Sequence, residues 1–250
     1  MSETLVSVQN LRKDYYDSLG REITACRDLS FDAHAGEVFG ILGTNGAGKT
    51  TALRMLSTVL RPTSGDARIA GHSVITAPDM VRKSIGFLSA DTGVYGRLTA
   101  REMIQYFGRL NGMADPAIAS RLSDIAVALD MESFLSRRCD KLSSGQKQRV
   151  NIARTIIHDP PVLIFDEPTA GLDILASAQI VRFVRESRER GRCVIFSTHV
   201  MREAEKLCDR LVILHQGQVC LAGTLSEVRA HAGTEDLEEV FLSAIGETRL

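Results

Sequence analysis

The sequence lacks the features that direct a protein into or across a membrane. None of its apolar runs approaches the roughly 20 residues that a membrane-spanning helix requires. The first residues, Met1-Ser2-Glu3-Thr4-Leu5, form neither a basic n-region nor an apolar h-region, so we expect no secretory signal there. These absences predict a protein of the cytoplasm.

Cysteine is sparse, and the spacing of the cysteines argues against a disulfide framework and against a metal cluster. The five cysteines are an odd number, they are widely separated, and none belongs to a C-x-x-C pair. We therefore expect reduced, mostly buried thiols in place of a disulfide framework, and no metal cluster. The five are Cys26, Cys139, Cys193, Cys208 and Cys220.

The sequence also has no excess of charge of one sign. Its formal net charge is −1 at pH 7. A domain that binds nucleic acid broadly usually presents a basic surface, so we expect no nucleic-acid partner. The chain of 250 residues is long enough to form one large domain, or a core with an inserted subdomain, without disulfides or structural metals.

The most informative pattern present is a glycine-rich run, Gly43-Thr44-Asn45-Gly46-Ala47-Gly48-Lys49-Thr50, which fits G-x-x-x-x-G-K-S/T. A buried strand is predicted before it, at 38–42, and apolar residues recur at helical spacing after it until Arg61-Pro62. Glycines let backbone N–H groups point at an anion, and a helix N-terminus adds partial positive charge. Lys49 can reach the outer phosphates and the Thr50 hydroxyl can ligate magnesium. The run predicts a nucleoside-triphosphate site.

Strands and helices alternate along most of the chain. Two β-rich runs flank a polar turn around 17–20 and predict an antiparallel hairpin. After the phosphate loop, a helical block is expected from about 95 to 160, including a helix that begins near Ser144. Beyond it, strand and helix alternate again, which predicts a parallel sheet covered on both faces. The expected strands lie at 5–8, 22–25, 67–70, 84–88, 162–165, 193–196, 211–214 and 218–221, and the later helices at about 174–190 and 200–208.

Two carboxylates, Asp166 and Glu167, directly follow the apolar run at 162–165. In open α/β sheets, ligands lie at the carboxyl ends of the strands, which is also the edge where a phosphate loop sits. Asp166 is then placed to hold magnesium, and Glu167 to orient and polarise the attacking water. An Asp-Glu pair after a strand more often caps a helix, but the phosphate loop upstream favours the catalytic interpretation.

A further motif, Leu142-Ser143-Ser144-Gly145-Gln146, precedes a predicted helix. Locally it is only an N-cap. At this place in the chain it resembles the L-S-G-G-Q signature of ATP-binding cassette (ABC) proteins, with Ser144 in place of the first glycine. Two more segments occur in that family's order: Thr169-Ala170-Gly171-Leu172-Asp173 resembles its D-loop, and Ser197-Thr198-His199 its switch-histidine segment.

The chain thus resembles the nucleotide-binding subunit of an ABC transporter over nearly its whole length. The resemblance implies ATP and Mg²⁺ as cofactors, nucleotide contacts from Gly43 to Thr51, and catalytic roles for Lys49, Glu167 and His199. It implies that Tyr15 stacks on adenine, although Tyr16 is a rival. It also implies a two-fold ATP sandwich, in which each ATP is bound between two copies of the chain. One copy contributes its phosphate loop, and the other contributes Ser143, Gly145 and Gln146.

The same resemblance implies a fold and a location. The fold is α/β, a P-loop NTPase (RecA-like) core with an antiparallel β-subdomain and an inserted helical subdomain. The core is expected at 1–94 and 161–230, the helical subdomain at 95–160 and a C-terminal helical tail at 231–250. The family acts at the inner face of the cell membrane, bound to an integral-membrane permease subunit.

The sequence departs from the family at one loop. After the strand at 85–88 the family has Pro-Gln, and that glutamine contacts magnesium and the membrane partner; here Ser89 and Ala90 stand instead. Asp91 is a possible replacement ligand, since magnesium favours oxygen donors, and an equally good interpretation is a solvated loop carboxylate.

The stretch 85–102 and the tail 236–242 are similar to exporter ATPases of the NatA sodium-exporter and DrrA-like drug-resistance groups. Sodium efflux and export of a drug or another substrate both remain open. An ABC importer is less well supported, because this stretch and tail are similar to exporters. A soluble ABC ATPase that acts on ribosomes or nucleic acid is less well supported, because the chain has one cassette, no coiled-coil arm and almost no net charge.

Overall fold

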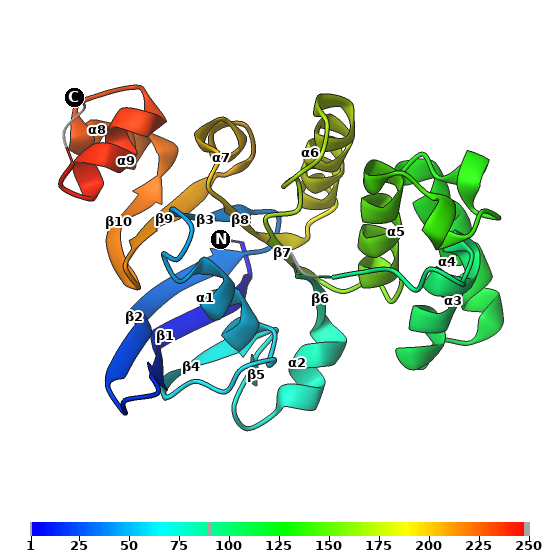
Figure 1. Ribbon diagram of the computed structural model, residues 1–250, viewed down its shortest axis with the longest axis horizontal. Helices are drawn as coiled ribbons and strands as arrows, with labels where there is room; N and C mark the ends of the chain where they lie inside the picture. Colours follow the sequence, from blue (N-terminus) through cyan, green and yellow to red (C-terminus); the bar gives the residue numbers. More distant parts are fainter. Residues whose placement is uncertain (1, 90–91, 248–250) are drawn as a thin grey trace.

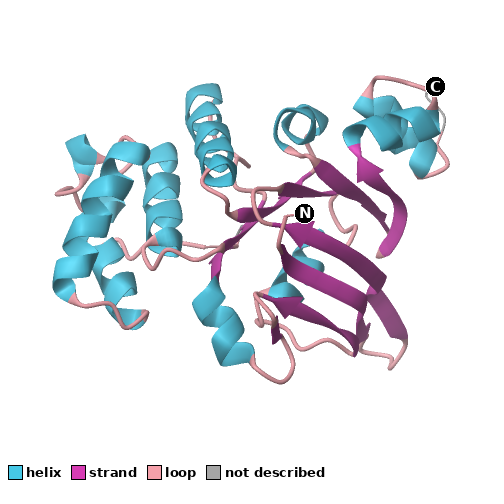
Figure 2. Cartoon of the chain, turned by 180° about the vertical axis from the view of Figure 1, so that it is seen from behind, coloured by secondary structure: helices cyan, strands magenta, loops and turns pink. Residues whose placement is uncertain are grey.

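The structure is a computed structural model and describes residues 2–89 and 92–247. Figure 1 shows two sheets on one side of the molecule and a separate block of helices on the other. Figure 2 shows the same division from behind. The predicted α/β fold, with an antiparallel β-subdomain and an inserted helical subdomain, is confirmed.

The smaller sheet is antiparallel and has the strand order β2-β1-β4-β5. Its strands are β1 (Thr4–Tyr16), β2 (Glu22–His34), β4 (Ser64–Ile69) and β5 (His72–Ser73). The predicted hairpin is β1 and β2, but each strand runs for 13 residues, far beyond the four predicted. Irregularities in the β1–β2 register, with positive φ at Asn10 and Asp28, interrupt the alternation of buried and exposed side chains that marks a strand.

The larger sheet has the order β10-β9-β3-β8-β7-β6 and is parallel except for its edge strand β10. Its strands are β3 (Val38–Leu42), β6 (Ile85–Leu88), β7 (Val162–Asp166), β8 (Cys193–Thr198), β9 (Arg210–His215) and β10 (Gln218–Thr224). All residues of β3, β7 and β8 are buried, as expected for parallel strands covered on both faces.

Each central strand contributes to two hydrophobic cores, because successive side chains point to opposite faces. In β3, Phe39 and Ile41 join the core between the two sheets, where α1 (Lys49–Leu56) packs against β2 and β7. Val38 and Leu42 face the other way, into the core shared with the helices on the far side. The sheet edge that carries the phosphate loop is therefore anchored from both faces.

The helical block holds α3 (Ala100–Leu110), α4 (Asp115–Ala128) and α5 (Ser144–Ile156), with short 3₁₀ turns at Glu132–Phe134 and Cys139–Lys141. A capping box formed by Thr99 and Glu102 starts α3, and the helix predicted near Ser144 is α5. Gly86 permits the block to approach the core, because a Cβ there would lie 2.7 Å from the Thr155 carbonyl oxygen. The domain boundaries remain a prediction.

The remaining helices cover the larger sheet and its edges. They are α2 (Pro78–Ser84), α6 (Ile174–Glu189), α7 (Met201–Leu207), α8 (Leu225–Ala232) and α9 (Leu237–Ala244). The sequence predicts α6 and α7 but not α2, α8 or β5, which are too short to show a clear period. Across 2–89 and 92–247, no helix combines the length and the apolar character needed to cross a bilayer. Four cysteines are buried and Cys220 is exposed, as predicted.

Candidate functional site

The phosphate loop connects β3 to α1 and leaves the first turn of α1 open. Gly46 and Gly48 have φ of 82° and 103°, which favour glycine, and the N-cap Gly48 offers no side-chain cap to the helix. A Cβ at Gly48 would lie 2.3 Å from the Ala25 carbonyl oxygen. The free N–H groups of this turn and the helix dipole create a site for an anion.

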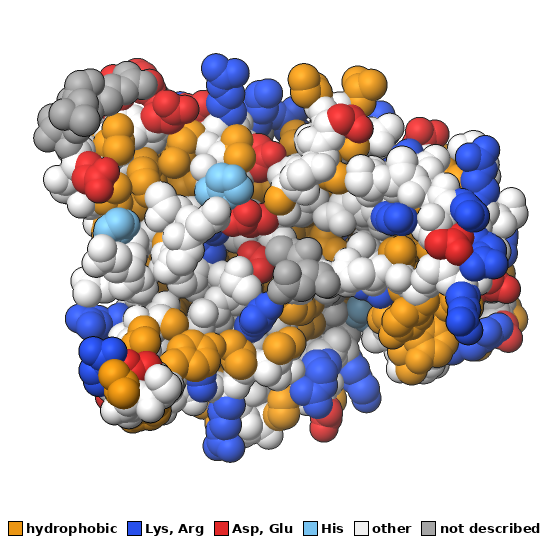
Figure 3. Space-filling view, in the orientation of Figure 1, with side chains coloured by type: hydrophobic (Ala, Val, Ile, Leu, Met, Phe, Trp, Pro, Cys, Tyr) orange, Lys and Arg blue, Asp and Glu red, His pale blue; other side chains and the backbone are white. Residues whose placement is uncertain are grey.

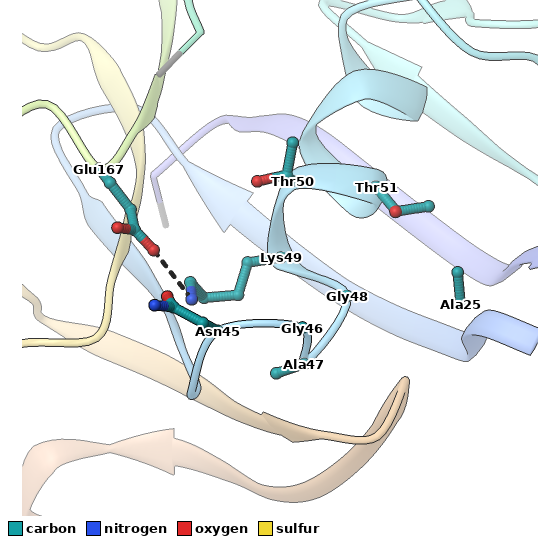
Figure 4. Close-up of a pocket in the computed structure, with 9 residues that line it drawn as sticks. All are labelled: Ala25, Asn45, Gly46, Ala47, Gly48, Lys49, Thr50, Thr51 and Glu167. Atoms are coloured by element: carbon teal, nitrogen blue, oxygen red, sulfur yellow. Dashed lines mark ion pairs between the residues drawn. The ribbon is translucent and has the colours of Figure 1, made fainter. Parts of the chain in front are cut away.

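A pocket of about 190 Å³ opens at this turn. Figure 4 shows its lining residues: Ala25, Asn45, Gly46, Ala47, Gly48, Lys49, Thr50, Thr51 and Glu167. Seven of these nine are consecutive loop and helix residues predicted from the motif, and Glu167 was predicted from its place after β7. Ala25, on β2, was not predicted, because only the packing of β2 against the loop brings it there.

Lys49 is at the centre of this pocket although its side chain is 4% exposed. Its Nζ donates hydrogen bonds to the carbonyl oxygens of Gly43, at 2.8 Å, and Thr44, at 3.1 Å. It also forms an ion pair of 2.9 Å with Glu167 Oε1. The ammonium group therefore lies where the loop's own backbone and one carboxylate satisfy it.

Glu167 links this lysine to the predicted histidine. Its second oxygen, Oε2, lies 2.9 Å from His199 Nδ1. Glu167 has φ of 46°, a conformation unusual for a non-glycine residue, and its backbone N–H donates to the Ser197 hydroxyl at 3.0 Å. The three residues predicted to be catalytic, Lys49, Glu167 and His199, thus form one chain of contacts.

Asp166 is fully buried beside them. Its Oδ1 accepts a hydrogen bond of 2.7 Å from the Ser197 hydroxyl, while its Oδ2 has no hydrogen-bond partner in the described part of the chain. A buried carboxylate oxygen without a partner is costly unless a cation or a donor satisfies it. Magnesium prefers such oxygen donors, and the Thr50 side chain lines the adjacent pocket. The donor set fits magnesium, and Ser197, which in the sequence only precedes the histidine segment, supports Asp166.

The signature residues lie elsewhere in the chain. Ser143 and Gln146 cap the start of α5, each side chain bonded to the other's backbone N–H, at 3.2 Å and 3.0 Å. A Cβ on Gly145 would lie 2.9 Å from the Ala176 Cβ of α6, so within one chain this glycine permits close helix packing. None of the three residues lines the phosphate pocket, and Figure 1 shows α5 within the helical block.

Neither candidate for stacking on adenine lines the pocket. The Tyr15 ring is 39% exposed and lies under Lys13 Nζ at 5.4 Å, while Tyr16 is 70% exposed. Both lie at the end of β1, and the choice between them remains open.

The departing loop is only partly described. Ala90 and Asp91 lie outside the described residues, so the possible magnesium contact of Asp91 stays a prediction. Next to them, Asn151 of α5 donates to the Thr92 carbonyl oxygen at 2.9 Å. Gln148, one turn earlier, donates to the Pro168 carbonyl oxygen at 2.6 Å, which ties α5 to the segment after Glu167.

Comparison with known proteins agrees with this geometry. The family model described as "ABC transporter" matches residues 26–170. The chain is 40% identical to the ABC transporter ATP-binding protein NatA of Bacillus subtilis (strain 168) over 224 residues, 89% of this chain and 91% of that protein. It is 32% identical to the daunorubicin resistance ATP-binding protein DrrA3 of Streptomyces coeruleorubidus over 244 residues, 98% of this chain and 76% of that one.

A solved structure is similar over most of the chain. A dimeric bacterial ABC transporter cassette superposes with a TM-score of 0.79 at 26% identity, covering 88% of this chain and 98% of that one.

Proposed function

Because the chain belongs to the ABC transporter family, we propose that it is the ATP-hydrolysing subunit of an exporter and drives transport through a separate membrane permease. One observation carries this proposal. Glu167 contacts Lys49 with one carboxylate oxygen and His199 with the other, next to the open first turn of α1. A base, a cation for phosphate and a histidine thus converge on an anion-binding turn, as phosphoryl transfer to water requires.

We assign the roles from the contacts of each group. The backbone N–H groups from Gly43 to Thr51 and the Lys49 ammonium bind the phosphates, which draws Lys49 away from Glu167. The freed Glu167 carboxylate then orients and polarises the attacking water, and His199 holds that carboxylate in position. Asp166 and Thr50 hold magnesium, which when bound neutralises charge on the phosphate oxygens.

A second copy of the chain is the proposed partner in ATP binding. The start of α5, with its capping residues Ser143 and Gln146, is a helix N-terminus that lines no part of the chain's own phosphate pocket. Such a terminus favours an anion. The similarity to a dimeric cassette supports a dimer of this chain. In that dimer, each ATP would lie between one copy's Lys49 and the other copy's Gly145.

The permease is the second proposed partner, and it holds the protein at the inner face of the membrane. On the face shown in Figure 3, hydrophobic side chains gather over the helical block. The large exposed hydrophobic side chains of this block are Tyr95, Tyr106, Leu110 and Val127. The Tyr95 and Tyr106 rings lie 6.1 Å apart, and neighbouring exposed apolar side chains of this kind are typical of a surface that binds another protein.

For the transported substrate we propose sodium, supported by the 40% identity with NatA. Export of a drug is the second candidate, supported by the similarity to the daunorubicin resistance protein. The substrate itself binds the permease, so the residues of this chain do not distinguish the two.

The test uses inverted membrane vesicles from cells that express this chain together with a candidate permease, chosen as a membrane protein with about six apolar segments of ~20 residues whose gene neighbours that of this chain. We expect ATP and Mg²⁺ to drive ²²Na⁺ uptake into these vesicles, and Glu167→Gln to abolish it. Uptake of daunorubicin in place of sodium would favour the second candidate. Absence of Mg²⁺-dependent ATP hydrolysis by the wild-type chain would contradict the proposal as a whole.

A further inference from the structure

We propose that Glu203 of α7 is a positioning residue that holds His199 against Glu167 through the Thr198 hydroxyl. This inference rests on the proposed function, because it assigns a support to a histidine that the function requires. It concerns a carboxylate that belongs to no motif and does not contact the pocket.

The backbone on both sides of His199 depends on one hydroxyl group. Thr198, at the end of β8, is 2% exposed. Its Oγ1 accepts a hydrogen bond from the Val200 N–H at 2.9 Å and donates one to Glu203 Oε2 at 2.8 Å. The hydrogen bond from the Val200 N–H joins Thr198 to Val200, and His199 is the single residue between them. The backbone of His199 is therefore held at both ends.

Glu203 closes this arrangement into a ring. Its own N–H donates to the Val200 carbonyl oxygen at 3.0 Å, in the first turn of α7. Val200 is the N-cap of α7 and has no side-chain oxygen with which to cap it. The Glu203 carboxylate therefore orients the Thr198 hydroxyl, which fixes the turn between β8 and α7.

The ring is also tied to the phosphate loop. The Gly43 N–H donates to the Thr198 carbonyl oxygen at 3.4 Å, and Gly43 accepts from Lys49 Nζ. Movement of the His199 turn would therefore shift the contacts of Lys49 as well as those of Glu167. Since the His199 side chain is 44% exposed, this backbone ring supplies much of its orientation.

Substitutions at position 203 can separate the effect of the Glu203 hydrogen bond from the effect of its charge. A glutamine at 203 keeps the length of the side chain and an oxygen that accepts from Thr198, but it has no charge. An aspartate keeps the charge but is one methylene too short to reach the hydroxyl. If Glu203 acts through its hydrogen bond, the Glu203→Gln variant should have the kcat of the wild type. The Glu203→Asp variant should then show the same loss of kcat as Glu203→Ala.

The experiment measures kcat and KM for ATP in the Ala, Asp and Gln variants of Glu203. We expect Ala and Asp to lower kcat about five- to tenfold, the effect of one hydrogen bond, with KM within about twofold. In a His199→Ala background, Glu203→Ala should lower kcat no further. The control is Glu205→Ala, on the same helix, whose carboxylate pairs with Arg229 at 2.9 Å and which should keep the wild-type kcat.

A second measurement needs neither catalysis nor ATP. The ¹⁵N resonance of His199 Nδ1 reports its contact with Glu167, and it should shift in the Ala and Asp variants but not in Gln. Effects of Glu203→Ala and His199→Ala that multiply in the double variant, or an unchanged Nδ1 resonance in folded Glu203→Asp, would overturn the positioning role. If the wild type hydrolysed no ATP, the proposed function would fail, while the resonance would still decide the role of Glu203.

Discussion

Lys49 and Glu167 form a 2.9 Å ion pair within the phosphate pocket, and the side chain of Lys49 is almost fully buried. Each group thereby satisfies the charge of the other. Under the proposed function, phosphate oxygens would compete with Glu167 for the ammonium, so ATP binding and release of the Glu167 carboxylate would be one exchange. Because of this ion pair, a substitution of either residue also changes the surroundings of the other.

Lys49→Ala should weaken ATP binding strongly. Within the described residues 2–89 and 92–247, Lys49 is the only cationic side chain that lines the pocket. The variant loses this cation, while the backbone N–H groups of the loop remain. Loss of a charge-assisted contact of this kind lowers affinity by about tenfold or more. Titration with a fluorescent ATP analogue measures it, and an unchanged Kd would contradict the role of Lys49.

Glu167→Gln should separate binding from catalysis. The neutral amide cannot act as a base, so we expect turnover to fall by about 100-fold or more. Since the ion pair with Lys49 is also lost, ATP should bind at least as tightly as to the wild type. Single-turnover hydrolysis and equilibrium binding on the same preparation test both expectations; full turnover would exclude Glu167 as the base.

ATP should bring two copies of the chain together when hydrolysis is slow. Light scattering on Glu167→Gln is expected to show a dimer with ATP and a monomer without it, since Ser143, Gly145 and Gln146 reach no phosphate in their own chain. Lys49→Ala is the control and should stay monomeric. A nucleotide-loaded Glu167→Gln that remains monomeric at high concentration counts against the sandwich.

Two loop glycines should differ in how well they tolerate alanine. Gly46 has φ of 82° with open space at its Cβ position, so Gly46→Ala adds only backbone strain of about 1–2 kcal/mol. At Gly48 the Cβ would also meet the Ala25 carbonyl oxygen at 2.3 Å. We expect the larger loss in the free energy of unfolding for Gly48→Ala, measured in urea. Equal losses would show that the loop relaxes around the clash.

Stability should decrease below about pH 6.5 because of His158. Burial lowers the pKa of this imidazole from 6.5, although its Nε2 bonds to the Ile85 carbonyl oxygen at 2.9 Å. The unfolded chain then binds the proton more readily than the folded one. The stabilisation is therefore complete above about pH 6.5 and is lost as the pH falls toward the folded pKa.

The variant His158→Gln cannot titrate and should flatten the dependence of Tm on pH between 7.5 and 5.5, above the range where most carboxylates titrate. His231→Gln, on the exposed side of α8, is the matched control and should follow the wild-type curve. A His158→Gln curve parallel to that of the wild type would exclude this histidine as the cause.

Much of the site could be predicted from the sequence, because its parts are local. The glycines from Gly43 to Gly48, the strand before them and the helix after them lie within 20 residues and show clear periods. The carboxylates Asp166 and Glu167 follow a fully apolar strand. The long strands β1 and β2 were predicted far too short, because their irregular register breaks the alternation of side chains.

The sequence by itself therefore determined the nucleotide-binding loop, the acidic strand end and the family, since each depends on residue types at short spacing. Only the tertiary structure decided that Glu167 contacts both Lys49 and His199, and that Glu203 supports the turn that carries His199. The reason is the strand order β3-β8-β7. Hydrogen bonding and two-sided packing place β8 between the other two, so the ends of three strands distant in sequence meet at one edge.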